Sequence, residues 1–236
     1  MRQNDLLIRN ENIQRLFDWY LKGDFIVNRK YQRKLVWTIE EKQQFINSIL
    51  SDYPVPLFLL AITSESRYEI IDGMQRLNAI FAFIKGEYSV NFNGQEGYFD
   101  LQTMAVTKEL MDTGMYIQKA PLLDRTLCSQ YVNYQLPLSI TNFEDRQIEE
   151  IFRRINATGR QLSSQDLRQA GTTHPFSELV RKISIAIRRD SSPSDILALS
   201  QMEEISLSNR NLAYGINMAD TFWVKNGIIT TSNMRV

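Results

Sequence analysis

The stretch that most constrains this sequence is residues 67–85, RYEIIDGMQRLNAIFAFIK, because its periodicity changes sharply near the centre. The first residues include the aromatic and β-branched side chains typical of a strand. Asp72 and Gly73 then interrupt the strand at a point where glycine gives access to unusual backbone angles. From Met74 onward, apolar residues recur at helical spacing. The stretch therefore predicts a strand, a sharp turn and a helix with one apolar face.

Polar residues stand at the predicted start of this helix. Gln75 and Arg76 fall in its first turn, where backbone N–H groups lack partners within the helix and the helix dipole favours negative charge. These features suit a bound phosphate group. A structural interpretation accounts for the same residues, because Asp72 is a favoured helix N-cap and Gly73 is common in tight turns. Taken alone, the spacing favours the structural interpretation.

A second polar cluster precedes another predicted helix. Residues 25–37, FIVNRKYQRKLVW, begin like a strand and then mix basic with aromatic side chains. Thr38 and Glu41 have the spacing of a capping box, so we expect a helix from there to about Leu50. Basic and aromatic residues together can bind nucleic acid by pairing with phosphates and stacking on bases. A solvated loop has the same composition, and without other context it is the more common case.

The first hundred residues are expected to form a small sheet with helices. An amphipathic helix is predicted within residues 12–23, and the apolar run 56–62 is typical of a buried strand that pairs with residues 68–71. Asn93 and Gly94, placed between two short alternating runs, predict a hairpin at the edge of this sheet.

The pattern changes beyond residue 100. Residues 122–138 suggest a strand-rich connection, residues 144–155 a helix, and residues 176–236 a mainly helical segment. We therefore expect an α+β fold, with a sheet-and-helix domain at residues 1–100 and a mainly helical extension at 101–236 packed on it.

Composition excludes several classes of protein. Among 236 residues, the formal net charge of +0 argues against a protein that coats nucleic acid. One Cys and one His exclude a disulfide framework, a His/Cys zinc site and a Cys–His nucleophile built by this chain, so neither zinc nor haem is expected. The longest apolar run is too short to span a bilayer, and the N-terminus has no secretory pattern. We expect a cytoplasmic protein without a membrane partner.

Three segments of the chain resemble one family. DGMQRLNAI at residues 72–80 resembles the DGQQR motif in the N-terminal domain of GmrSD-type, modification-dependent restriction enzymes, with Met74 in place of the first Gln. YQRKLVWTIEEKQQFINSILSDYPVP at 31–56 is similar to the family's Y-Q-R-x-x-V-W segment and the helix after it. FRRINATGRQLSSQDLRQAG at 152–171 resembles the family's second recurrent segment. Separated matches in the right order are far more specific than one match.

The resemblance implies a nucleotide site on a ParB/sulfiredoxin-like fold, in which a loop before a helix and a turn after a strand hold a phosphate. It predicts that Arg33 and Arg76 face one cleft. The residues implied as catalytic are Asp72, Gln75 and Arg76. The residues implied in binding nucleotide phosphates are Tyr31, Gln32, Arg33, Gly73, Arg154, Asn156 and Arg168. Asp72 is expected either to hold a Mg²⁺ ion that accompanies the nucleoside triphosphate or to orient the attacking water.

We accordingly expect the nucleotide-binding sensor domain of a DNA restriction or phage-defence system, for which NTP hydrolysis is the reaction that these residues suit. The resemblance implies a His-Asn-His nuclease after this domain in members that cut DNA, and a single His cannot build that site here. A separate nuclease or effector chain is the expected partner. The alternative is a non-catalytic module that reads modified or foreign DNA, with Arg29, Lys30 and Lys34 in a block, residues 29–37, that contacts the DNA backbone or modified bases.

Overall fold

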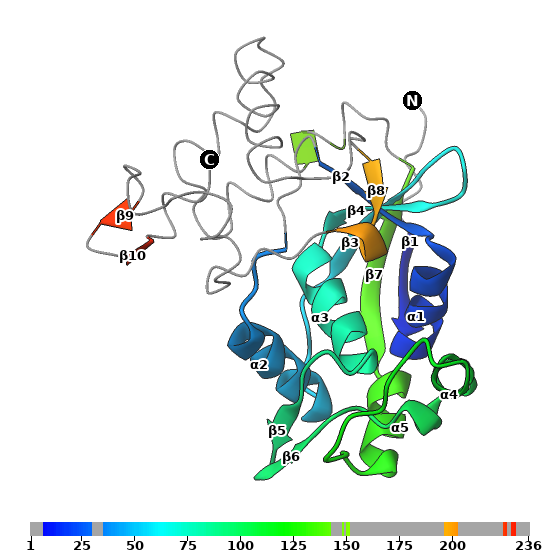
Figure 1. Ribbon diagram of the computed structural model, residues 1–236. Coiled ribbons are helices and arrows are strands. Elements are labelled where there is room, and N and C mark those ends of the chain that lie inside the picture. Colours follow the sequence, from blue (N-terminus) through cyan, green and yellow to red (C-terminus); the bar gives the residue numbers. More distant parts are fainter. Residues whose placement is uncertain are drawn as a thin grey trace. The chain divides into compact units, whose positions relative to one another are not determined.

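The computed structural model describes residues 7–29, 35–142, 148, 150–151, 196–202, 224–225 and 228–229 (Figure 1). The chain divides into two compact units. One unit consists of Met1–Val27, Trp37–Phe143 and Ala198–Met202, and the other of Asn28–Val36, Glu144–Leu197 and Glu203–Val236. The expected division of domains at residue 100 stays a prediction.

A mixed sheet organises the fold. Its strands follow the spatial order β1-β7-β3-β4-β2-β8. Their bounds are Leu7–Asn12 for β1, Phe25–Asn28 for β2, Phe58–Ile62 for β3, Tyr68–Asp72 for β4, Gln135–Thr141 for β7 and Ile196–Ala198 for β8. β3 runs antiparallel to β4 and parallel to β7, whereas β2 runs parallel to β4. The α+β class and the pairing of the two central strands are therefore confirmed, while the ParB/sulfiredoxin-like label stays a prediction.

Helices and short elements complete the fold. Their bounds are Ile13–Lys22 for α1, Ile39–Leu50 for α2, Met74–Ile84 for α3, Ala105–Asp112 for α4, Arg125–Asn133 for α5, Leu101–Thr103 and Leu199–Gln201 for two 3₁₀ turns, Val90–Phe92 for β5, Gln95–Gly97 for β6, Val224–Lys225 for β9 and Ile228–Ile229 for β10. α3 lies on the sheet between α1 and α2 (Figure 1). In the second unit, β9 and β10 form an antiparallel pair.

Local sequence signals set the ends of the first two helices, as predicted. The Asn12 side chain accepts a hydrogen bond from the Arg15 N–H at 2.8 Å, and Gly23 ends α1 in the left-handed conformation. At α2, the Thr38 hydroxyl accepts from the Glu41 N–H at 3.2 Å, and the Glu41 carboxylate accepts from the Thr38 N–H at 3.0 Å. The capping box is therefore confirmed.

The core is centred on α3. The predicted apolar face is buried, but so are residues on the other sides of the helix, including Ala79, Ala82 and Phe83. Phe81 contacts the rings of three residues in the N-terminal part of the chain, namely Phe17, Tyr20 and Phe25. Since the sheet, α1 and α2 all pack around it, α3 is a central helix and not a half-exposed one.

Two segments, β1 and α5, differ from the sequence-based expectation. β1 was not predicted, since its residues are mostly polar, yet it pairs antiparallel with β7 along its whole length. The strand-rich connection expected at 122–138 was wrong for α5, which begins at Arg125. The carboxylate of its N-cap, Asp124, accepts hydrogen bonds from the N–H groups of Thr126 and Leu127. The expectation was right from residue 135 onward, where β7 begins.

The predicted hairpin is confirmed, but its place was wrong. β5 and β6 are joined by Asn93 and Gly94, which both have positive φ, and they form a separate two-stranded sheet. Side chains of α2 explain its position, because Gln43 donates to the Ser89 carbonyl at 2.7 Å and Asn47 donates to the Asn91 carbonyl at 3.0 Å. The hairpin therefore packs on a helix and does not extend the main sheet.

Most of the helices expected at 144–155 and 176–236 lie outside the described residues. The described parts of the second range are β8, a 3₁₀ turn, β9 and β10. No described helix combines the length and the apolar character that crossing a bilayer requires.

Phe83 provides a test of the core. Its ring is fully buried, and the ring centre lies 5.2 Å from that of Tyr131 and 5.9 Å from those of Tyr88 and Phe99. We expect Phe83→Ala to lower the free energy of unfolding by about 3–5 kcal/mol in urea denaturation. Ile117→Ala is the control, because that side chain is 75% exposed and its loss should stay within about 0.5 kcal/mol. Equal losses would contradict this assignment of the core.

Candidate functional site

The candidate site is the turn between β4 and α3. β4 ends at Asp72, which pairs with Leu59 of β3, and α3 begins at Met74. Gly73 is thus the N-cap residue, and it has no side chain with which to cap the helix. The interpretation of Asp72 as the N-cap is therefore wrong. The physical reason is that sheet pairing holds Asp72 in the strand and leaves the reversal of direction to Gly73.

Gly73 is required by both its backbone and its surroundings. Its φ of 101° lies in the region that residues with a side chain rarely adopt. A Cβ atom added here would lie 2.4 Å from Cδ1 of Phe58, which is closer than real contacts allow. Phe58 is itself fully buried at the start of β3. Gly73 therefore lets β3, β4 and α3 approach one another closely.

Arg76 is bonded on several sides to the protein itself. Its Nη1 donates to the Pro56 carbonyl, and its Nη2 donates to the Leu57 carbonyl at 3.1 Å and to Asp72 Oδ2 at 2.8 Å. The guanidinium carbon also lies 4.4 Å from the centre of the Phe58 ring. Only 11% of the Arg76 side chain is exposed. The residue thus joins the start of α3 to the end of β4 and to the segment that leads into β3.

Burial and Asp72 act on the Arg76 charge in opposite directions. Burial lowers the pKa of the guanidinium from its ordinary value, and the charge and hydrogen bond of Asp72 oppose that change. An arginine stays protonated at neutral pH, so the pair is ionic. Asp72 itself is half-exposed, with 45% of its side chain accessible. Its carboxylate is therefore held from one side and open to solvent on the other.

The Gln75 side chain connects the turn to a second part of the sequence. Its Oε1 accepts a hydrogen bond from the Trp37 N–H at 3.3 Å. The Trp37 ring packs edge to face with that of Phe45 in α2, with centres 5.6 Å apart. Since Arg76 also bonds to Pro56 and Leu57, the turn contacts the chain both before and after α2.

Met74 stands where the resembling motif has Gln, and its surroundings explain why an apolar residue suits that position. The residue is almost fully buried in the first turn of α3. Burying an unpaired amide there would cost free energy, whereas a thioether costs none.

The structure places only part of the predicted site. Asp72, Gly73, Gln75 and Arg76 lie together in the turn, and their roles stay predictions. Arg29 is half-buried and belongs to the second unit. The other predicted residues lie outside the described residues, and with them the prediction of a cleft shared by Arg33 and Arg76: Lys30, Tyr31, Gln32, Arg33, Lys34, Arg154, Asn156 and Arg168. Sequence analysis missed Pro56, Leu57 and Phe58, because carbonyl groups give no signal in a sequence and Phe58 reads as an ordinary core residue.

Metal binding by the described residues would depend on Asp72 with help from a ligand. In the part of the chain that the structure describes, no group of three or more His, Cys, Asp or Glu residues could hold a metal ion. One carboxylate with one oxygen already bonded to Arg76 fits Mg²⁺ only when water and phosphate oxygens supply the other ligands.

The fold and this turn define the class of the protein, an α+β domain in which a strand, an Asp-Gly turn and a helix follow one another at one end of the sheet. Residues 4–172 match the family model of the GmrSD restriction endonuclease N-terminal domain, which covers more than half of the chain. The chain therefore belongs to that family, and it is a component of a restriction system. The comparison with curated proteins found no match.

Substitution of Gly73 tests the close approach at the turn. Gly73→Ala combines left-handed backbone strain with overlap on Phe58, so we expect the free energy of unfolding to fall by about 2–4 kcal/mol. Gly23→Ala is the matched control, because Gly23 has a φ of 78° but nothing lies within 4 Å of its added Cβ. The control should lose only about 1–2 kcal/mol from strain. Urea denaturation measures both, and a Gly73→Ala loss no larger than that of Gly23→Ala would remove Phe58 from the explanation.

Proposed function

We propose that this domain binds a nucleoside triphosphate with Mg²⁺ at the start of α3 and hydrolyses it as the sensor of a restriction system. The observation that carries the proposal is the Asp72 carboxylate, which is half-exposed and yet fixed by the buried Arg76. A carboxylate held in one orientation beside a helix N-terminus suits a metal ion that accompanies a phosphate.

The helix start supports the phosphate part of the proposal. The N-terminus of a helix presents backbone N–H groups and a partial positive charge. The N-cap residue Gly73 provides no carboxylate or hydroxyl that would compete with a phosphate there. β2 and β4 run parallel, so the turn after β4 stands at the carboxyl ends of both strands. Ligands of parallel sheets commonly bind at that end.

Asp72 supports the metal part. Mg²⁺ in nucleotide sites is usually held by one or two carboxylates together with substrate phosphates and water. When bound, the ion neutralises charge on the phosphates. Asp72 would hold it through the oxygen that Arg76 leaves open, or else orient the attacking water. The sequence-based proposal adds Tyr31, Gln32 and Arg33, and also Arg154, Asn156 and Arg168, as phosphate-binding residues.

The direct test measures nucleotide binding by calorimetry and phosphate release, with each of the four NTPs, with and without Mg²⁺ and with and without DNA. We expect binding and turnover of at least one NTP in the presence of Mg²⁺. The absence of both with every nucleotide would overturn the proposal. DNA binding without any nucleotide binding would instead favour the DNA-reading alternative that uses Arg29, Lys30 and Lys34.

The donor set predicts that metal and nucleotide bind jointly. A single available carboxylate should bind Mg²⁺ weakly, whereas phosphates complete the coordination of the ion. We therefore expect chelation of Mg²⁺ to weaken nucleotide binding by at least about tenfold, or 1.4 kcal/mol. Calorimetric titration with and without EDTA measures this effect. Equal affinity in both conditions would exclude Asp72 as a metal ligand.

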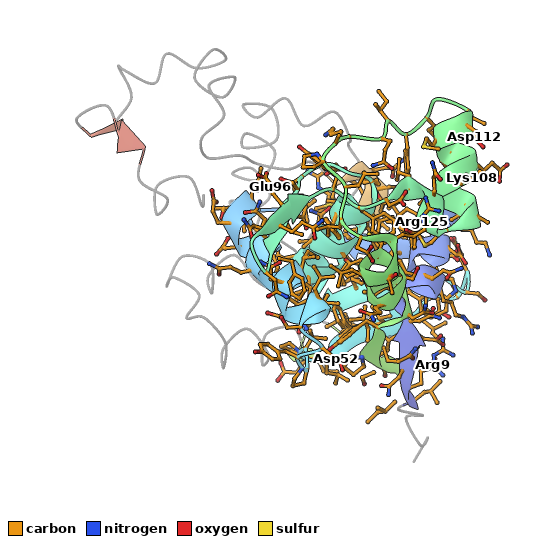
Figure 2. The ribbon with its side chains drawn as sticks, turned by 90° about the horizontal axis from the view of Figure 1, so that it is seen from below. Arg9, Asp52, Glu96, Lys108, Asp112 and Arg125 are labelled. Carbon is orange, nitrogen blue, oxygen red and sulfur yellow. The ribbon has the colours of Figure 1, made fainter. Side chains whose placement is uncertain are left out.

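Substitution of Asp72 tests its chemical role. Asp72→Asn keeps the shape and can still accept from Arg76, so stability should fall by only about 1 kcal/mol. The neutral amide lacks the charge that binds Mg²⁺ or takes a proton from water, so the hydrolytic rate should fall by about 10²-fold or more. The matched control is Asp112→Asn, at an exposed aspartate at the end of α4 (Figure 2). Full NTP turnover by Asp72→Asn would show that the turn has a structural role only.

A further inference from the structure

We infer that Arg76 is a positioning residue, which orients the Asp72 carboxylate for Mg²⁺ and does not itself bind phosphate. This inference rests on the proposed function and deepens it, because it divides the roles within the turn. Asp72 would contact the Mg²⁺–nucleotide complex, and Arg76 would act only through Asp72.

The hydrogen bonds of Arg76 argue against direct phosphate binding. Arginine recognises phosphate best through two parallel N–H donors of its planar fork. In this turn both terminal nitrogens already donate to protein oxygens, Nη1 to Pro56 and Nη2 to Leu57 and Asp72. These bonds use three of the five N–H groups, including both on Nη2, so a phosphate bound through parallel donors that include Nη2 would have to displace Leu57 or Asp72. The hydrogen bonds to the two carbonyls are part-buried, so breaking one of them would cost free energy.

The burial of Arg76 points in the same direction. Only 11% of the side chain is accessible, against 45% for Asp72. The guanidinium also lies over the fully buried Phe58 ring, which leaves no room for a Cβ atom at Gly73. A ligand that arrives from solvent therefore meets the carboxylate more readily than the guanidinium.

The arrangement gives Asp72 a fixed orientation. Arg76 is held by backbone carbonyls of the segment before β3, so its Nη2 stands at a defined point beside α3. The hydrogen bond to Asp72 Oδ2 then limits rotation of the carboxylate and leaves the exposed part of the carboxylate for a ligand. Groups that orient a metal ligand in this way commonly change metal affinity or activity by about ten- to a hundredfold when they are replaced.

Lysine separates the two roles of Arg76. Arg76→Lys keeps the positive charge, and lysine is itself a common phosphate ligand. Its single ammonium lacks the planar fork that reaches Pro56, Leu57 and Asp72 from two nitrogens. If Arg76 bound phosphate as a charge, lysine would largely replace it. If Arg76 positions Asp72, lysine would not.

The experiment is a double-mutant cycle with the full chain. The affinities of non-hydrolysable ATP and GTP analogues are measured with and without Mg²⁺ for the wild type, Asp72→Asn, Arg76→Lys and the double variant. We expect Arg76→Lys to weaken Mg²⁺-dependent binding by about ten- to a hundredfold and to leave Mg²⁺-free binding unchanged. In the Asp72→Asn background it should have no further effect.

Arg125→Lys is the matched control for a merely structural effect. Arg125 (Figure 2) also pairs with an aspartate, with its Nε 2.7 Å from Asp100 Oδ2 and its Nη2 bonded to Gln102. In this pair the guanidinium is the exposed partner, with 58% of the Arg125 side chain accessible. Urea denaturation of all variants shows whether Arg125→Lys and Arg76→Lys lose comparable stability. Only Arg76→Lys should change the Mg²⁺ dependence of nucleotide binding.

Each outcome decides the inference. Two results would show that Arg76 contacts phosphate directly. In one, the losses of affinity caused by Asp72→Asn and Arg76→Lys multiply in the double variant. In the other, Arg76→Lys weakens binding as much without Mg²⁺ as with it. A wild type that binds neither analogue overturns the proposed function, and with it this inference. A crystal structure of the wild type with Mg²⁺ and the analogue decides the question even if Arg76→Lys fails to fold. We expect Arg76 to remain on Asp72, Pro56 and Leu57 in that structure, and a guanidinium moved onto a phosphate would overturn the inference.

Discussion

The arrangement of this domain depends most on the hydrogen bonds and the ion pair made by the buried guanidinium of Arg76. A buried guanidinium is stable only when its donors are paired, and the loss of one partner from a buried pair is more costly than the pair itself is stabilising. Here the acceptors come from the segment before β3 and from the end of β4, while Arg76 belongs to α3. One side chain therefore fixes the relative positions of two strands and a helix. The close approach of Gly73 to Phe58 brings the same three elements together by packing.

The apolar part of α3 connects this turn to the hydrophobic core. Beyond its first turn the helix is buried on nearly every side, and Phe81 and Phe83 join two aromatic groups that come from different parts of the chain. Dense packing of this kind leaves little freedom to the helix axis. The turn at the N-terminus of α3 is held in place as well, because the helix cannot shift without disturbing the aromatic contacts of Phe81 and Phe83. A site built on such an element is held more accurately than a site on a long loop.

Features were predictable from the sequence when the interacting residues are close together along the chain. The start of α1 near Asn12, the cap at Thr38 and the hairpin turn at Asn93 involve partners within four residues, so their signals are local and these features were predicted. β1 and the place of the hairpin depend on partners far along the chain, and nothing in their own residues names those partners. The same holds at the site. The DGMQR segment was recognised from its own residues, whereas the bonds from Arg76 to Pro56 and Leu57 join groups 19 and 20 positions apart through backbone carbonyls that every residue has.

Packing and protein hydrogen bonds account for some residues of the turn but not for all of them, and the exception indicates where function lies. Gly73 is required by its backbone angle and by Phe58, Met74 by burial, and Arg76 by its protein acceptors. Each of these would be retained in a domain that binds nothing. Asp72 is different, because a partner for Arg76 could be supplied by a neutral oxygen, and nearly half of the side chain faces solvent. A carboxylate that is both held in place and accessible offers more than the fold needs from it. The functional role of this turn is therefore decided at Asp72, while the residues around it chiefly determine how accurately that carboxylate is presented.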